Sequence, residues 1–113
     1  MAATGLHGPF RLDQTSINNQ VTHTSPGAYA LGRHVGDTFY VDYVGRSDSD
    51  LASRLSDWVG NYQYFKFGYF ASPKAAFEKE CHLFHDFGET ALDNKVHPAR
   101  PAGSGWRCPR CNF

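Results

Sequence analysis

A chain of 113 residues is long enough for one domain to bury a core unaided, and its nine Phe and six Tyr exclude disorder throughout. Eleven Lys and Arg balance eleven Asp and Glu, so the net charge of zero excludes a global attraction to nucleic acid. No apolar run approaches the roughly 20 residues of a membrane helix and no signal-peptide pattern opens the chain, so a cytoplasmic protein without membrane contact is expected.

Residues 1–24 are polar and show no sustained hydrophobic period, which predicts a loop or partly ordered N-terminal arm. Four apolar side chains could attach this arm to the domain: Phe10, Leu12, Ile17 and Val21. The domain itself is expected over residues 25–96, followed by a C-terminal tail over residues 97–113.

Three extended segments follow the arm. Residues 28–35 begin after Ser25-Pro26-Gly27, and residues 39–44 alternate in the manner of a strand. Gly36-Asp37 lies between these two segments and predicts an antiparallel hairpin. The aromatic run over residues 62–70 predicts a third strand.

A first helix is expected over residues 48–59, with Ser47 as its N-cap and Asp50 three residues later. An apolar stripe runs along it through Leu51, Leu55, Trp58 and Val59. Arg54 lies at the margin of this stripe, about 60° from Leu51 at ~100° per residue. From there it can reach across a pocket mouth, although a solvated Arg is the alternative.

A second helix is expected from Ser72-Pro73 to about residue 87, with Ser72 at the cap position. Glu80 falls in its apolar arc, between Phe84 and Phe87. A buried carboxylate needs a cation, a set of donors or a wet pocket. A divalent metal meets that need, and so does an ion pair with Arg54 or Arg46.

Several residues in this order resemble the GIY-YIG nuclease family over roughly residues 25–95. They are Gly27-Ala28-Tyr29, Tyr43-Val44-Gly45, Arg54-Leu55, Glu80 with Leu83-Phe84, and Asn94. Each is weak alone, but their joint order on strand, strand, helix, helix and loop is fairly specific. Ala28 and Val44 each replace an Ile, and the spacer between the tripeptides is longer than usual; neither departure removes a catalytic side chain.

The resemblance implies an α+β domain with a central three-stranded antiparallel sheet flanked by helices, which cleaves phosphodiester bonds in nucleic acid with one divalent metal. Glu80 would hold Mg²⁺ or Mn²⁺, and Arg54 would neutralise charge on the phosphate. Tyr29 would activate or orient water, Tyr43 would hydrogen-bond water or phosphate, and Asn94 would help to fix the site. Arg46 would contact the phosphate. DNA is favoured over RNA as the substrate.

The tail carries Cys108-Pro-Arg-Cys111, which is half of a tetrahedral zinc site. Cys81 and His85, or His97, could complete a structural zinc site, and an unliganded thiol pair is the alternative. From residue 94 onward the chain has four basic residues and no acid, so the tail could steer a phosphate backbone locally.

Other functions stay open at this point. The fold could serve as a non-catalytic nucleic-acid-binding or protein-interaction module, or as a small zinc protein in which Tyr29, Tyr43 and Arg54 are only structural. The neutral net charge favours a binding module, or a nuclease that needs a protein partner or a homodimer to find its substrate.

Overall fold

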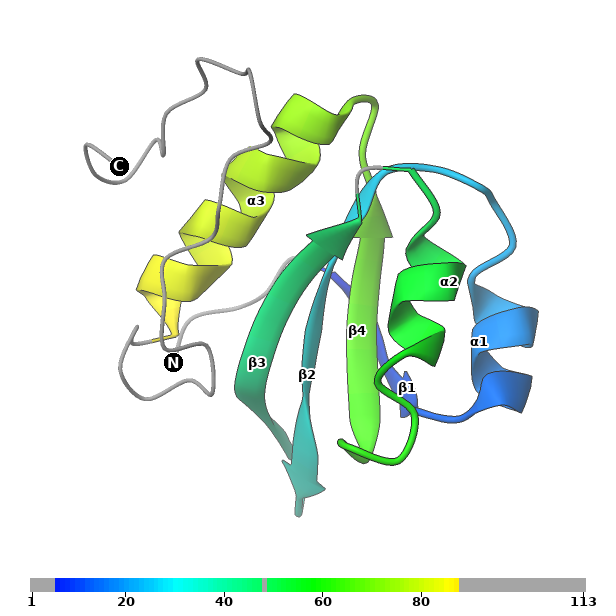
Figure 1. Cartoon of the computed structure of the whole chain (residues 1–113). Coiled ribbons are helices and arrows are strands. Elements are labelled where there is room, and N and C mark those ends of the chain that lie inside the picture. Colours follow the sequence, from blue (N-terminus) through cyan, green and yellow to red (C-terminus); the bar gives the residue numbers. More distant parts are fainter. Residues whose placement is uncertain (1–5, 48, 88–113) are drawn as a thin grey trace.

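A computed structural model describes residues 6–47 and 49–87 of the chain. They form an α+β fold in which helices flank one antiparallel sheet with strand order β1-β4-β2-β3. The strands are β1 (His7–Arg11), β2 (Gly27–Val35), β3 (Thr38–Ser47) and β4 (Tyr64–Tyr69). The helices are α1 (Gln14–Gln20), α2 (Leu51–Ser56) and α3 (Pro73–Asp86). Helix α3 covers one face of the sheet, and α1 and α2 lie on the other (Figure 1).

In the described residues the sheet has four strands, which are the three expected ones and one more. The additional strand is β1, which pairs with β4. Helix α1 follows it, capped by Asp13, whose side chain accepts a hydrogen bond of 2.7 Å from the Ser16 backbone N–H. The expectation of a loop or partly ordered arm over residues 1–24 was therefore wrong for β1 and α1. The expected attachment of this segment to the domain by apolar side chains is confirmed for Leu12, Ile17 and Val21, which are buried in the core.

The predicted hairpin is confirmed by the pairing of β2 with β3, in which Tyr29 lies opposite Gly45. Gly36 turns the chain with a φ of 59°, a backbone conformation that residues other than Gly rarely adopt. The predicted third strand is confirmed as β4, which pairs with β2 on the side opposite β3. Strand β3 therefore forms an edge of the sheet.

The two predicted helices differ in how well their ends were placed. Helix α3 has the predicted cap, since the Ser72 side chain accepts a hydrogen bond from the Ala75 N–H at 3.2 Å. Helix α2 is shorter than predicted, and its cap is Asp50, which accepts from the Ser53 N–H at 3.2 Å. Ser47 instead accepts from the Asp50 N–H at 3.0 Å, one turn before the helix.

The core has a separate cluster on each face of the sheet. On the α1 and α2 face, side chains of both helices pack against the rings of β2 and β4. On the α3 face, Leu83 and Phe84 pack against Ala28, Ala30 and Val44. None of the helices within the described ranges is long and apolar enough to cross a membrane.

Candidate active site

A pocket of about 220 Å³ lies at the edge strand β3 and contains most of the predicted site residues. Its lining residues are Tyr29, Tyr43, Gly45, Arg46, Arg54, Trp58 and Glu80. Five of the six side chains predicted for phosphate and metal chemistry are thus brought together. The sixth, Asn94, lies outside the described residues.

The pocket contains side chains from both faces of the sheet because it lies at an edge of the sheet. Successive residues of a strand point to opposite faces. Tyr43 packs with the α2-side cluster, whereas Val44 packs with the α3-side cluster. Arg46 follows the same alternation and contacts Glu80 of α3. Residues from α2 and from α3 can therefore approach one another around β3.

Tyr29 is a buried residue that lines the pocket. Its side chain is only 2% exposed, and its hydroxyl accepts a 2.9 Å hydrogen bond from the indole N–H of Trp58. Its ring lies so close to Gly45 that a Cβ there would be 2.5 Å from the phenol oxygen. Gly45 is therefore needed for the close approach of strand and ring. Burial raises the pKa of the Tyr29 phenol well above its usual 10.0.

Tyr43 lies nearer to solvent in the same pocket. It is half-buried, and its ring centroid is 4.5 Å from that of Trp58. Burial, and after it the nearby carboxylate of Glu80, raises the pKa of Tyr43. Both phenols are therefore protonated at neutral pH and can donate hydrogen bonds to a bound anion.

Glu80 is buried, as its place in the apolar arc predicted, and is 7% exposed. The guanidinium of Arg46 donates to its Oε1 at 2.7 Å. Arg46 also lies over the Phe77 ring, 5.2 Å from its centroid. The charge of Glu80 is thus compensated by Arg46, one of the two cations that the sequence indicated as its partner.

Arg54 is exposed on α2 and lines the pocket, which agrees with its predicted place at the helix margin. The Arg54 guanidinium can bind phosphate oxygens through several parallel N–H groups. The pocket thus combines one exposed guanidinium with two phenols and a buried ion pair.

A metal site of several protein ligands is not built into the described residues, which contain no group of three or more His, Cys, Asp or Glu side chains arranged around one point. The donor set nevertheless fits a hard divalent cation. Mg²⁺ keeps several waters and needs only one or two protein carboxylates in addition to substrate oxygens. Glu80 is the carboxylate that the pocket offers, and its Oε1 also accepts from Arg46.

The predicted zinc site falls largely outside the described residues, because Cys108, Cys111 and His97 all do. Cys81 is fully buried in the core beside Phe77, and His85 is half-buried one turn further along α3. Structural zinc stays a prediction.

Two pocket residues were not predicted as part of the site. Trp58 was interpreted only as a member of an apolar stripe, although it holds the Tyr29 hydroxyl. Gly45 was interpreted as the end of a strand and as part of a motif, although β3 continues to Ser47 and Gly45 admits the Tyr29 ring. The indole N–H offered a partial signal, since a Trp near a pocket usually finds a hydrogen-bond acceptor.

Comparison of the chain with protein-family models, with curated proteins and with solved structures found no match.

Proposed function

We propose that this chain is a metal-dependent endonuclease of the GIY-YIG type that hydrolyses phosphodiester bonds in nucleic acid, with DNA as the favoured substrate. The observation that carries the proposal is the convergence of Tyr29, Tyr43, Arg46, Arg54 and Glu80 on one small pocket. These residues come from four different elements. A purely structural role would not require them to share one solvent-accessible hollow.

The pocket suits a phosphate group. Arg54, exposed at the rim, would bind the phosphate and offset the charge that develops on it. Tyr43 would donate a hydrogen bond to a phosphate oxygen or to the attacking water. When held by Glu80, a divalent cation would supply further stabilisation of negative charge on the phosphate oxygens.

Tyr29 would act as a donor that orients water, because its raised pKa keeps the phenol protonated at neutral pH. Its acceptor lone pair already receives the Trp58 N–H, which fixes the position of the hydroxyl. Activation of water by Tyr29 as a base would require a cation close enough to lower that pKa again.

The test is cleavage of a panel of duplex, branched and single-stranded DNA and RNA in Mg²⁺ or Mn²⁺. Glu80→Gln and Arg54→Ala are each expected to reduce cleavage by about a hundredfold or more, as for other losses of a preorganised charge in an active site. Glu78→Gln on the same helix and Arg33→Ala on β2 are matched controls, since neither residue lines the pocket. Because contaminating nucleases are common, only activity lost in both pocket variants and kept in both controls supports the proposal.

Cleavage at the normal rate by a well-folded Glu80→Gln protein would contradict the catalytic assignment. The second candidate is a non-catalytic nucleic-acid-binding module. It is favoured by the Arg46–Glu80 ion pair, which already engages the carboxylate of the pocket. Equal inactivity of wild type and all variants, with binding of nucleic acid retained, would select this second function.

A further inference from the structure

A second, larger pocket of about 400 Å³ lies where β1 ends and the chain enters β4. Its lining residues are Arg11, Leu12, Gly60, Tyr62, Gln63 and Tyr64. None of them lines the candidate active site. The volume is sufficient for a group of the size of a nucleotide.

Aromatic rings connect the two pockets. Tyr62 lines the second pocket, and its ring centroid lies 6.1 Å from that of Tyr43 and 5.9 Å from that of Trp58. Tyr43 and Trp58 both line the candidate active site. The two hollows are therefore neighbours, separated by contacting rings.

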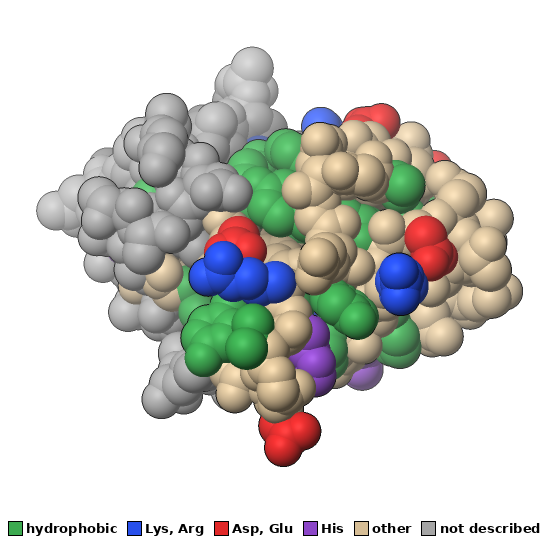
Figure 2. Space-filling view, turned by 90° about the horizontal axis from the view of Figure 1, so that it is seen from below, with side chains coloured by type: hydrophobic (Ala, Val, Ile, Leu, Met, Phe, Trp, Pro, Cys, Tyr) green, Lys and Arg blue, Asp and Glu red, His purple; other side chains and the backbone are tan. Residues whose placement is uncertain are grey.

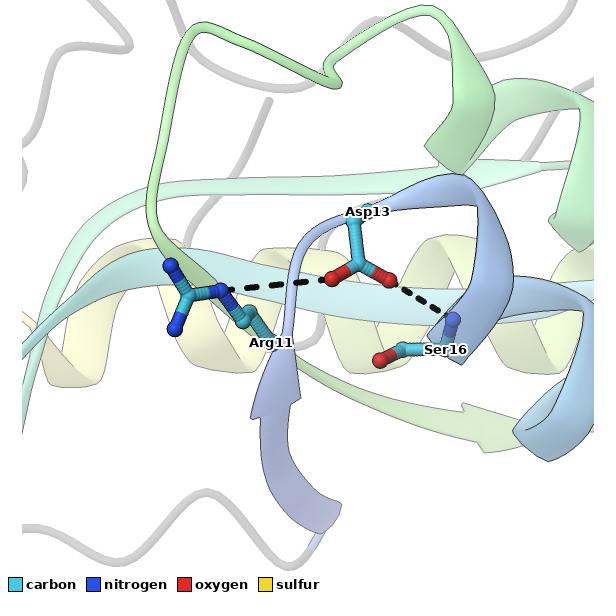
Figure 3. Close-up of polar contacts among 3 residues, drawn as sticks. All are labelled: Arg11, Asp13 and Ser16. Atoms are coloured by element: carbon cyan, nitrogen blue, oxygen red, sulfur yellow. Dashed lines mark hydrogen bonds and ion pairs between the residues drawn. The ribbon is translucent and has the colours of Figure 1, made fainter.

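Arg11 supplies a cation to the second pocket. Its side chain is 76% exposed, and only its Nε lies near Asp13, at 3.9 Å. The terminal nitrogens of the guanidinium point away from Asp13 (Figure 3). The other carboxylate oxygen of Asp13 accepts the Ser16 N–H as the cap of α1. Asp13 therefore orients Arg11 loosely and leaves its terminal nitrogens directed toward solvent, where they can bind a phosphate.

The remaining walls suit an unpaired base. Tyr62 and Tyr64 are only half-buried, and Gln63 is exposed with an amide that can both donate and accept. Aromatic faces take unpaired bases by stacking, and a nearby Arg binds the backbone. Among the described side chains visible in Figure 2, the Lys and Arg groups are scattered and several lie beside acids, with no continuous basic surface. On this face, the described side chains therefore offer local contacts to one strand and no broad track for a duplex backbone.

We infer that the second pocket binds an unpaired nucleotide of a nucleic-acid strand whose neighbouring phosphate lies in the candidate active site. Arg11 binds the phosphate of that nucleotide, and Tyr62 or Tyr64 stacks on its base. The inference rests on the proposed nuclease function for the identity of the neighbouring site. It specifies the substrate as a strand that is single-stranded on one side of the cut.

The test measures binding without catalysis. Fluorescence anisotropy of a short labelled oligo(dT), an oligo(U) and a duplex is recorded in EDTA with the full chain, over a range of salt concentrations. Arg11→Gln and Tyr64→Leu are each expected to weaken binding of the single strands at least about fivefold, the lower limit for one stacked base. Arg11→Gln is also expected to reduce the slope of log K against log salt by about 0.7, the value for one phosphate contact on a single strand.

The chain offers a matched pair of controls. Arg33 and Tyr40 are an exposed Arg and Tyr in contact with each other on the β2–β3 hairpin, outside both pockets. Arg33→Gln and Tyr40→Leu are expected to bind as wild type does, and all variants are checked for cooperative thermal unfolding. Four outcomes would each overturn the inference. They are equal losses of binding in the control pair, wild-type binding by Arg11→Gln and Tyr64→Leu, tighter binding of the duplex than of either single strand, and absence of single-strand binding by wild type.

Failure of this inference can be separated from failure of the proposed function. If Arg11 and Tyr64 are needed for binding and no protein cleaves any substrate, the nucleotide site stands and the nuclease fails. If wild type cleaves and the Arg11 and Tyr64 variants cleave single-stranded and duplex substrates as wild type does, the nuclease stands and the nucleotide site fails.

Discussion

At the scale of single residues, the ion pair between Arg46 and Glu80 links two elements and compensates a buried charge. Arg46 extends from the edge strand β3 between the Phe77 ring and the Glu80 carboxylate of α3. A buried pair of this kind adds little net stability compared with two apolar side chains, because both ions lose their hydration. Removing one partner of such a pair lowers stability far more than replacing both partners by apolar side chains does.

Arg46→Gln is therefore expected to lower the free energy of unfolding by about 3–5 kcal/mol, since it breaks a buried ion pair on one side only. Urea unfolding followed by circular dichroism measures the change. The exposed Arg33→Gln is the control and should change stability by less than about 0.5 kcal/mol. The double variant Arg46→Met with Glu80→Leu should recover most of the loss. A single variant as stable as wild type would show that the pair does not carry the charge balance described above.

At the scale of elements, the first strand and helix complete the core. Strand β1 extends the sheet beside β4, and α1 packs Ile17 against the same cluster as Leu51 and Leu55 of α2. The segment that precedes the motif-bearing strands is therefore part of the domain, and its removal would open the α1 and α2 face of the sheet.

Ile17→Ala tests the contribution of α1. Ile17 is fully buried, and truncating a buried Ile to Ala costs about 2–5 kcal/mol, including the cavity that remains. Asn19→Ala on the exposed side of the same helix is the matched control and is expected to stay within about 0.5 kcal/mol of wild type. Similar stabilities for the two variants in thermal unfolding would mean that α1 does not belong to the cooperative core.

At the scale of the whole molecule, stability should fall in alkaline solution because of Tyr29. Its folded-state pKa is raised by burial above the value of 10.0 that it has when unfolded, so the folded state keeps the phenolic proton when the unfolded state has lost it. The stability contribution is present below about pH 10 and is lost as pH rises further, at ~1.4 kcal/mol per pH unit. Unfolding experiments from pH 8 to pH 12 should show a flatter decline for Tyr29→Phe than for wild type. Equal slopes would contradict the assignment.

The parts of this fold that could be predicted are those with long local signals. Helix α3 has a clear cap at Ser72 and a long apolar arc, and the β2–β3 hairpin has alternating residues around Gly36. Strand β1 was missed because it is five residues long and pairs in an irregular register. Helix α1 was missed because seven residues are too few to show a helical period. The cap of α2 was misplaced because Ser47 and Asp50 both fit the pattern, and only the folded chain selects between them.

The same distinction applies to the candidate site. The order of Tyr29, Tyr43, Arg54 and Glu80 along the chain could indicate a pocket, since each falls on a strand or helix of recognisable type. The partner of Glu80 could not be chosen between Arg46 and Arg54, because that choice depends on how α3 approaches the edge of the sheet. The contact from Trp58 to Tyr29 joins residues that are distant in sequence, and no local pattern predicts it. Asn94 and the pair Cys108 and Cys111 stay predictions.

The Arg46–Glu80 pair has a consequence for how this protein can change during evolution. A substitution at either position alone breaks the ion pair on one side, which costs stability, whereas a joint change to apolar residues keeps the fold and removes the carboxylate of the pocket. Positions 46 and 80 should therefore covary among descendants of this sequence. Lineages that no longer need the chemistry can lose it in one coordinated step and still retain a stable domain for other uses.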